Sequence, residues 1–237
     1  MLDPKGRVIL ISGANRGIGR AIAETLHAKG YALSLGVRDP GAAAGTFPAM
    51  AGDRLHLARY DARDWATHEA WVRAALARYG RIDGLVNNAG AHSTKTIRDI
   101  DEATLDEVWA VNCKAPLNMI KCALPVLEAG GAGRVVNVAS LSGKRVRNDN
   151  IAYNMTKFAV MALTHATRRL GWDKGVRATA LCPSFVLTDM TAGTTKVAAS
   201  EMIDSGDLAE LAAMLIALPN TASVAELLVN CRLEDMV

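Results

Sequence analysis

The sequence predicts an α/β fold in which a parallel sheet of about seven strands carries helices on both faces. Short apolar runs alternate along the chain with longer stretches whose apolar residues recur every three or four positions. This alternation is typical of repeated strand–helix–strand units. The short runs are almost continuously apolar, as expected for strands that are covered on both faces. Half of the 237 residues are hydrophobic and 22% are charged, which is the balance of an ordinary globular protein.

The first half of the chain follows this pattern closely. A β-branched run at residues 7–12 predicts the first strand, which ends at Gly13. Residues 17–29 place Ile18, Ile22 and Leu26 on one face and stop at Gly30, so they predict a helix. Apolar runs at residues 31–37 and 55–60 predict two more strands, and the small-residue stretch 41–52 between them is expected to be a loop. A helix at residues 64–79 and a strand at residues 82–87 follow.

The second half continues the alternation. Helical periodicity extends over residues 104–128, and strands at residues 134–139 and 176–182 flank a helix at residues 151–172. A helix near residues 207–218 and a strand near residues 223–229 are the last predicted elements. No stretch has the composition of an interdomain linker. We therefore expect one domain over residues 1–237, with a short substrate flap near residues 189–206.

Composition excludes several classes of protein. The net charge is only +3 and aromatic residues make up 5%, which is too little for a nucleic-acid-binding surface. The longest apolar stretch, residues 211–218, is far shorter than the ~18 residues that span a bilayer, and the first residues lack the pattern of a secretory signal. The four cysteines and five histidines show no metal-ligand spacing. We expect a cytoplasmic protein without a metal site or disulfides.

Three glycines lie where the first strand passes into the first helix. Gly13, Gly17 and Gly19 form the pattern G-x3-G-x-G. Glycines at this point let the backbone approach a pyrophosphate at the N-terminus of a helix. A tight turn without a ligand is the alternative interpretation, because a glycine triplet by itself is weak evidence.

Further motifs follow in a fixed order, each near the carboxyl end of a predicted strand or on a predicted helix. They are Asp61, Asn87-Asn88-Ala89-Gly90, Asn112, Ser140, Tyr153-x3-Lys157, and Pro183 to Thr188. This ordered set resembles the short-chain dehydrogenase/reductase family over roughly residues 5–230. The resemblance implies a doubly wound Rossmann fold and an oxidoreductase that exchanges a hydride between a nicotinamide cofactor and a small carbonyl or alcohol substrate.

The resemblance assigns the catalytic set Asn112, Ser140, Tyr153 and Lys157. Tyr153 and Lys157 are four residues apart on a predicted helix and therefore share a face. A tyrosine hydroxyl titrates at about pH 10, so one that exchanges protons near neutrality needs a neighbouring cation, which Lys157 can provide. The resemblance implies that Ser140 holds the substrate oxygen and that Asn112 organises a water. The alternatives are a lysine covering an exposed tyrosine, a capping serine and a buried structural asparagine.

The end of the second predicted strand bears on the cofactor. Family members that use NAD carry an acidic residue 24 positions after the first loop glycine, and this chain has Val37 there. Arg38 follows and Arg16 lies in the glycine loop, so two guanidinium groups could hold the 2′-phosphate of NADP. Asp39 could instead bind the ribose hydroxyl of NAD or pair with Arg38. We expect NADP, with NAD as the alternative. The expected cofactor-binding residues are Gly13, Asn15, Arg16, Gly17, Ile18, Gly19, Arg38, Asp61, Ala62, Asn87, Asn88, Ala89, Gly90, Tyr153, Lys157, Pro183, Val186 and Thr188.

The substrate pocket is less defined by the sequence. Ser184 stands where the family usually has glycine, and a positive φ there would strain serine. By position, the pocket-lining candidates are His92, Ser142, Arg145, Asn148, Phe185 and Met190. The basic cluster Lys144, Arg145 and Arg147 follows Ser140 and could attract an anionic substrate, although a solvated basic loop is the simpler interpretation.

Two broader expectations concern the oligomeric state of the protein and its alternative functions. The helices at 104–128 and 151–172 carry apolar residues on more than one face, which predicts a homo-oligomer, a tetramer or dimer, in which they pair across a two-fold axis. No nucleic-acid or membrane partner is expected. The alternative function is a catalytically silent dinucleotide-binding regulatory protein. A serine hydrolase is excluded because Ser140 does not lie in G-x-S-x-G.

Overall fold

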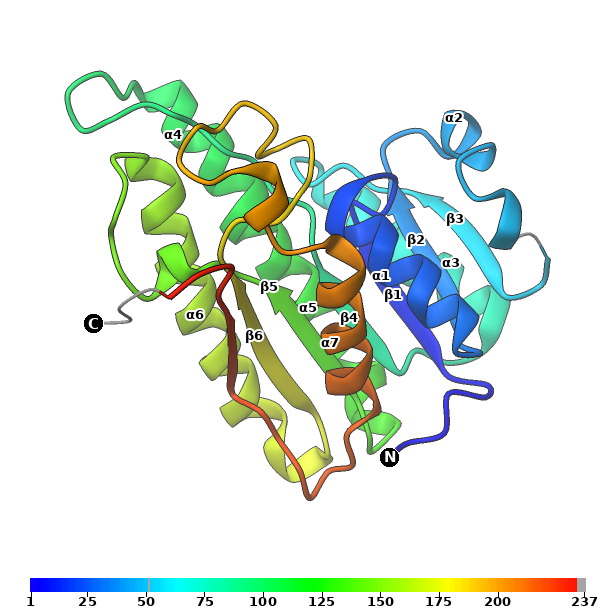
Figure 1. The fold of residues 1–237 in the computed structure, drawn as a ribbon. Coiled ribbons are helices and arrows are strands. Elements are labelled where there is room, and N and C mark those ends of the chain that lie inside the picture. Colours follow the sequence, from blue (N-terminus) through cyan, green and yellow to red (C-terminus); the bar gives the residue numbers. More distant parts are fainter. Residues whose placement is uncertain (51, 234–237) are drawn as a thin grey trace.

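The computed structural model describes residues 1–50 and 52–233, and their strands form one parallel sheet (Figure 1). Its strands lie in the order β3-β2-β1-β4-β5-β6-β7. They are β1 (Val8–Ser12), β2 (Ala32–Val37), β3 (Leu55–Arg59), β4 (Gly84–Asn87), β5 (Arg134–Val138), β6 (Arg177–Pro183) and β7 (Glu226–Val229). The strand order reverses direction between β1 and β4, and the carboxyl ends of parallel strands at such a point border a crevice suited to a dinucleotide.

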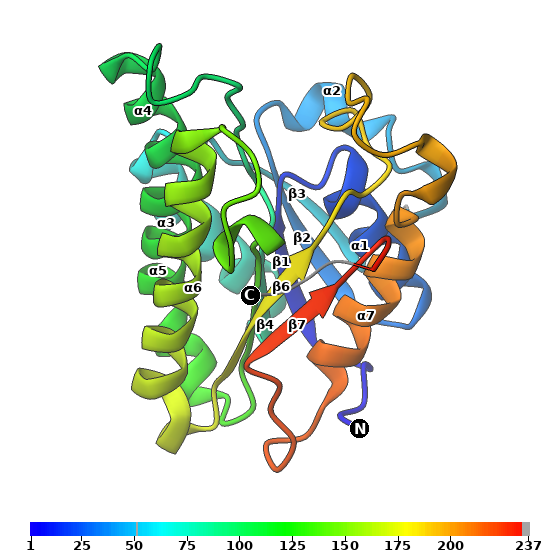
Figure 2. The same cartoon turned by 60° about the vertical axis from the view of Figure 1, so that its left-hand side comes forward.

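Helices cover both faces of this sheet (Figure 2). Helices α1 (Gly17–Ala28) and α7 (Ser205–Ala217) pack together on one face, where Ile22 and Leu26 are fully buried with Leu208. On the other face, α3 (Trp65–Tyr79), α5 (Ala115–Ala129) and α6 (Ile151–Gly171) bury a second core that includes Trp71 and Met119. The predicted doubly wound α/β fold is confirmed.

Side-chain caps explain where several helices begin. The Asp64 carboxylate accepts a hydrogen bond from the Ala66 N–H at 3.1 Å at the start of α3. Asp101 and Asp204 do the same for α4 (Glu102–Trp109) and α7. Each carboxylate satisfies an N–H group that has no partner within the helix. At the other end of α3, Gly80 has a φ of +72°, a conformation that glycine adopts without strain.

The predicted helix over 104–128 is divided. A π-helical segment, Ala110–Lys114, separates α4 from α5, and the Ala115 N–H donates to the Ala110 carbonyl five residues back. The physical reason is Pro116, which has no N–H for the Asn112 carbonyl and whose ring would clash with it in a regular α-helix. The widened turn contains Asn112 itself, a predicted catalytic residue.

The loop predicted at 41–52 also contains regular structure. Helix α2 (Pro40–Ala44) begins there, because Asp39 accepts a hydrogen bond from the Ala42 N–H at 3.1 Å and Pro40 occupies the first helical position. A 3₁₀ turn, Pro48–Met50, follows. The prediction of a loop was wrong for these residues, although Asp-Pro is a helix-start signal.

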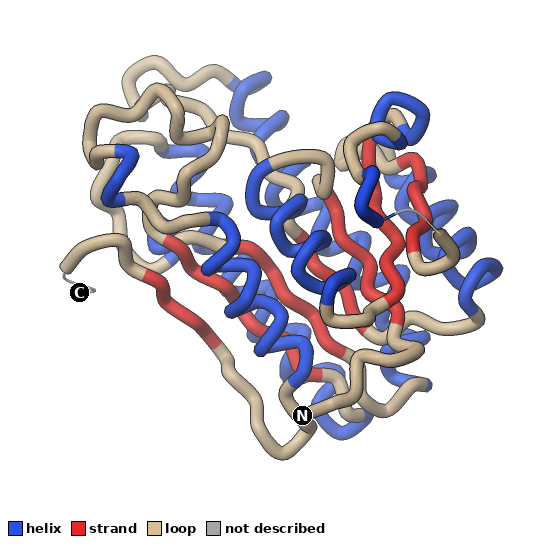
Figure 3. The backbone as a smooth tube through the Cα atoms, turned by 45° about the vertical axis from the view of Figure 1, so that its right-hand side comes forward, coloured by secondary structure: helices blue, strands red, loops and turns tan. Residues whose placement is uncertain are grey.

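The segment between β6 and α7 is mostly loop and lies beyond the carboxyl ends of the strands (Figure 3). A single bridge pairs Val186 with Ile203 and closes its base, and a 3₁₀ turn, Ala199–Glu201, lies within it. This is the segment predicted as a flap. Among the described residues, no helix has the length and apolar character needed to cross a bilayer.

Candidate active site

The glycine loop is held against the end of β4. The Ser12 hydroxyl accepts hydrogen bonds from the backbone N–H groups of Asn88 and Ala89 at 3.0 and 3.1 Å. The Asn88 amide donates in return to the carbonyl oxygens of Ser12 and Gly13, both at 3.0 Å. These hydrogen bonds join the ends of β1 and β4 at the point where the strand order reverses.

Side chains at the loop glycines would fill the space between these strand ends. A Cβ on Gly13 would lie 2.9 Å from the Ala89 Cα, and the φ of Gly13 is +64°. A Cβ on Gly19 would lie 2.3 Å from the Asn88 Nδ2 atom. Gly17 has a φ of +53° and faces Thr188, whose Cγ2 would lie 3.3 Å from an added Cβ. The glycines thus let the loop pack closely on neighbouring segments. Within the described residues, no side-chain cap is present at the N-terminus of α1, so its free N–H groups fit a bound pyrophosphate.

The other predicted residues of this loop differ in exposure. Asn15 and Arg16 are exposed, and Ile18 is partly buried against the α1–α7 core. An ion pair of 3.4 Å joins Arg16 to Asp189 at the start of the flap, with both side chains more than two-thirds exposed. An exposed pair of this kind contributes little to stability, so the Arg16 guanidinium can exchange it for a phosphate.

The end of β2 presents an arginine rather than an acid. Val37 is buried and Arg38 is exposed, while the Asp39 carboxylate caps α2. The sequence allowed Asp39 either to turn inward or to pair with Arg38. In the structure its carboxylate instead caps the N-terminus of α2. After β3, hydrogen bonds from Arg63 lower the pKa of Asp61 against the effect of its partial burial, and the Arg38 charge adds to this. Beside Asp61, Ala62 packs against the second core.

Asn112 joins the loop after β4 to α6. Its Oδ1 accepts a hydrogen bond from the Ala91 N–H at 2.8 Å, and its Nδ2 donates to the Ala91 carbonyl at 2.9 Å. The same amide donates to the Thr156 hydroxyl at 3.0 Å, and Thr156 in turn donates to the Tyr153 carbonyl. Gly90 lies directly beside the Asn112 side chain. Sequence reasoning missed Thr156, although it lies inside the Tyr153-x3-Lys157 motif.

Lys157 and Tyr153 lie together on α6. The Lys157 ammonium is 5.3 Å from the centre of the Tyr153 ring and donates to the Val138 carbonyl at 2.8 Å. Lys157 is only 7% exposed, so its charge acts in a poorly hydrated environment. The pair thus has the mutual geometry that the sequence predicts.

Ser140 caps a short 3₁₀ turn, Leu141–Gly143, and its hydroxyl accepts a hydrogen bond from the Ser142 N–H at 3.1 Å. This turn packs tightly on α6, because a Cβ on Gly143 would lie 2.6 Å from the Lys157 carbonyl oxygen. The turn after β5 and the α6 residues are therefore held together. Ser140 is both a capping residue, as in the simpler interpretation, and a neighbour of the proposed catalytic pair.

His92 reaches this site from the loop after β4. Its ring lies edge-on to Tyr153, with the ring centres 5.8 Å apart and the planes at 74°. The other pocket candidates lie on the neighbouring segments: Ser142, Arg145, Asn148 and Phe185 are partly buried, and Met190 is half exposed. Asn87 is buried farther inside, where its amide donates to Asn137 at 2.8 Å.

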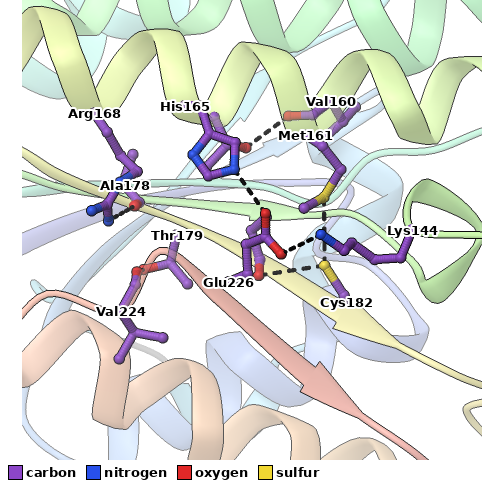
Figure 4. Close-up of polar contacts among 12 residues, drawn as sticks. Lys144, Val160, Met161, His165, Arg168, Ala178, Thr179, Cys182, Val224 and Glu226 are labelled. Atoms are coloured by element: carbon purple, nitrogen blue, oxygen red, sulfur yellow. Dashed lines mark hydrogen bonds and ion pairs between the residues drawn. The ribbon is translucent and has the colours of Figure 1, made fainter. Parts of the chain in front are cut away.

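The Lys144 side chain points toward Glu226 and the edge strand β7 (Figure 4). Its ammonium binds the Glu226 carboxylate on β7 at 2.7 Å, and His165 of α6 binds the other Glu226 oxygen at 2.8 Å. The Lys144 hydrogen bond is the main cause of a lowered Glu226 pKa. Because Lys144 is engaged in this pair, its predicted part in attracting an anionic substrate is not supported by the structure.

The chain departs from the family pattern at Ser184 without strain. Its N–H donates to the Val229 carbonyl at 2.8 Å and extends the pairing of β6 with β7 beyond the buried Pro183. Among the described residues, none other than glycine has a positive φ. The expected strain at Ser184 is therefore absent. The described residues also contain no group of three or more His, Cys, Asp or Glu side chains placed to hold a metal.

Comparison with known proteins agrees with this geometry. The family model described as short chain dehydrogenase matches residues 7–198. The chain belongs to the short-chain dehydrogenase/reductase family.

Relatives and solved structures of the short-chain dehydrogenase/reductase family extend the comparison. An agropine synthesis reductase of Rhizobium rhizogenes is 47% identical over 230 residues, which cover 97% of this chain and 53% of the relative. This chain thus spans about half the length of that relative. A 3-ketoacyl-(acyl-carrier-protein) reductase from Brucella melitensis, solved with NADH, has a TM-score of 0.87 and 28% identity over 96% of this chain and 98% of its own. An alcohol dehydrogenase from Thermococcus sibiricus, solved with 5-hydroxy-NADP, has a TM-score of 0.86 and 27% identity over 94% and 95%.

Proposed function

We propose that this short-chain dehydrogenase/reductase uses NADP to interconvert a carbonyl and a hydroxyl group on a small molecule, with Tyr153 as the general acid and base. The observation that carries the proposal is the buried Lys157 ammonium beside the Tyr153 ring. This pair adjoins the turn that holds Ser140, at the same end of the sheet as the glycine loop. The arrangement combines a proton donor, a cation and a dinucleotide cradle.

Each residue has a distinct part in the proposed reaction. When bound, the nicotinamide ring would supply or accept the hydride. The Ser140 hydroxyl would hold the substrate oxygen, and Tyr153 would give its proton to that oxygen during reduction and take it back during oxidation. The negative charge left on Tyr153 would be stabilised by the nearby Lys157 ammonium, because opposite charges attract more strongly in a poorly hydrated site than in water.

Asn112 supports this arrangement from the π-helical segment. Its three side-chain hydrogen bonds hold both the backbone of Ala91 and the hydroxyl of Thr156. We propose in addition that Asn112 organises a water that links Lys157 to solvent, as in the family that the chain resembles.

Preference for NADP is supported by the end of β2. Val37 provides no carboxylate to bind a ribose 2′-hydroxyl, and the Asp39 carboxylate is already engaged by the Ala42 N–H. Arg38 is exposed beside this position, and Arg16 is held only by an exposed ion pair. Two guanidinium groups without a competing buried acid favour a 2′-phosphate. One of the two similar solved enzymes was bound to an NADP derivative and the other to NADH.

We also propose a homo-oligomer built on the outer face of α4, α5 and α6. Apolar side chains are exposed there, with Leu117 at 50%, Met155 at 45% and Phe158 at 44%. A hollow of about 450 Å³ on this face is lined by Trp109, Val146, Ile151, Asn154, Met155 and Phe158. An apolar face of this kind is typical of subunit contacts.

Three other expectations from the sequence remain predictions. They are the single domain, the flap role of residues 189–206 and the cytoplasmic location.

A screen of aldehydes, ketones and alcohols with NADPH or NADH, and with the oxidised forms for the alcohols, tests the proposal. The Tyr153→Phe variant should lower kcat at least about 100-fold while the cofactor Kd changes little, because only the hydroxyl is removed. Tyr79→Phe is the matched control, since the Tyr79 hydroxyl donates to the Leu33 carbonyl away from the site. Wild-type kcat in Tyr153→Phe would contradict the acid–base role. A wild-type protein that binds NADPH but converts no compound would favour the silent regulatory alternative.

A further inference from the structure

The imidazole of His92 occupies the position beside the proposed acid–base residue. Its ring centre is 5.8 Å from that of Tyr153, and the two planes are nearly perpendicular. A carbonyl group that receives the Tyr153 proton must lie at the hydroxyl end of that ring. We therefore expect substrate atoms within a few bonds of the carbonyl to lie near the His92 ring.

His92 is fixed in this position from two sides. The residue before it, Ala91, is clamped by Asn112 through both its N–H and its carbonyl, at 2.8 and 2.9 Å. The His92 ring itself accepts a hydrogen bond at Nε2 from the Asn150 amide, with the two nitrogens 3.2 Å apart. His92 is exposed, and without such contacts an exposed histidine would sample several rotamers, so the contacts preorganise this one.

A chain of hydrogen bonds connects His92 to Ser140. The Ser142 N–H donates to the Ser140 hydroxyl oxygen at 3.1 Å, and the Asn148 amide donates to the Ser142 hydroxyl oxygen at 3.3 Å. The Asn150 N–H then donates to Asn148 Oδ1 at 3.0 Å, and the Asn150 side chain reaches His92. The residue proposed to hold the carbonyl oxygen and the His92 ring are thus parts of one connected structure.

The direction of these hydrogen bonds determines what His92 offers to a substrate. The Asn150 Nδ2 group can only donate, so Nε2 of His92 is the acceptor and the neutral ring carries its proton on Nδ1. In residues 1–50 and 52–233, no group forms a hydrogen bond with that Nδ1 atom. The site therefore contains a fixed N–H donor that is ready to bind an acceptor.

We infer that His92 is a specificity-determining residue that selects carbonyl compounds bearing an oxygen substituent within two carbons of the reacting carbonyl, such as hydroxy ketones and sugar-like ketones. This inference rests on the proposed function. An oxygen substituent would accept the Nδ1–H hydrogen bond, whereas an alkyl ketone of the same shape would displace water from that donor and leave it unpaired. Sites built to bind a polar group discriminate strongly against analogues that lack it.

Pairs of ketones with matched shapes test this inference. Hydroxyacetone is compared with 2-butanone, and dihydroxyacetone with 3-pentanone, with NADPH or NADH as reductant. The wild-type protein should prefer the hydroxylated ketone of each pair at least about tenfold in kcat/KM, which corresponds to about 1.4 kcal/mol. This ratio does not depend on the fraction of folded protein, so a general loss of structure does not change it.

Two His92 variants and one control complete the experiment. His92→Leu should reduce the ratio to about one, because leucine has no N–H group for the oxygen substituent. His92→Asn should keep most of the preference, because its side-chain N–H group can take the place of Nδ1–H. Thr94→Ala, an exposed position on the same loop, should leave the ratio unchanged.

The outcomes separate this inference from the proposed function. Turnover of both ketones without a preference, or a preference that survives in His92→Leu, would overturn the inference and leave the oxidoreductase proposal in place. A preference lost equally in His92→Asn and His92→Leu would also overturn the donor role. A wild-type protein that reduces no carbonyl compound with either cofactor would contradict the proposed function, and the inference would fall with it.

Discussion

Replacement of Gly19 by alanine should both destabilise the protein and weaken cofactor binding. Gly19 lies in the first turn of α1, where an added Cβ would be 2.3 Å from the Asn88 Nδ2 atom and 2.5 Å from the Gly13 carbonyl oxygen. Neither separation is tolerable for a carbon atom, so the Asn88 amide and the glycine loop must move. Asn88 holds that loop through hydrogen bonds to Ser12 and Gly13, both of 3.0 Å.

The magnitude follows from these contacts. Losing two hydrogen bonds at about 0.5–1.5 kcal/mol each costs about 1–3 kcal/mol, which is also the usual range for overpacking. The better helix propensity of alanine offsets up to about 1 kcal/mol of this. We expect a net loss of about 1–2 kcal/mol, or a decrease in Tm of about 2–8 °C for a chain of this size.

Thermal unfolding and NADPH titration of the Gly19→Ala variant measure the two effects. Gly45→Ala is the matched control, because a Cβ at Gly45 meets no atom within 4 Å and its φ is −74°. Asn88→Ala removes the same two hydrogen bonds, so the double variant should lose less stability than the sum of the single losses. A Gly19→Ala protein with the Tm and NADPH affinity of Gly45→Ala would refute the reasoning.

Three further predictions address the cofactor, the pH dependence and the assembly. Arg38→Ala should raise the KM for NADPH at least about tenfold, which corresponds to about 1.4 kcal/mol, and change the KM for NADH little. An equal rise in KM for both cofactors, or a wild-type preference for NADH, would contradict the NADP assignment. Glu226 has a lowered pKa in the folded protein, so its contribution is present at neutral pH and is lost as the pH falls through that value. Urea unfolding at pH 7 should therefore show Glu226→Gln to be less stable than the wild type by about 1 kcal/mol. This difference in stability should shrink in acid. An equal difference at neutral and acidic pH would count against the ion pair of Glu226 with Lys144 and His165. Phe158→Glu should lower the mass of the protein in light scattering, and a monomeric wild type at micromolar concentration would reject the proposed subunit contact.

Local signals in the sequence determined most of the fold. The apolar runs of the strands, the glycines after the first strand and the helical periodicities each depend on neighbouring residues, so their positions were predictable to within a few residues. The pairing of Tyr153 with Lys157 was predictable for the same reason, since residues four apart on a helix share a face. Because the carboxyl ends of parallel strands meet at one edge, the order of the motifs also indicated a common site.

Only the tertiary structure decided how segments distant in sequence meet. The contact of His92 with Tyr153 joins residues that are far apart in sequence, and no local pattern specifies it. From the sequence, the Lys144 side chain could have faced either a substrate or the edge of the sheet. It faces the sheet edge, because Glu226 on β7 binds its ammonium group. The division of the predicted helix at 104–128 depends on Pro116, a local signal, but the use of the widened turn to clamp Ala91 depends on how the β4 loop packs. Periodicity reports which face of an element is buried, whereas the partner of each polar side chain is fixed only when the elements pack together.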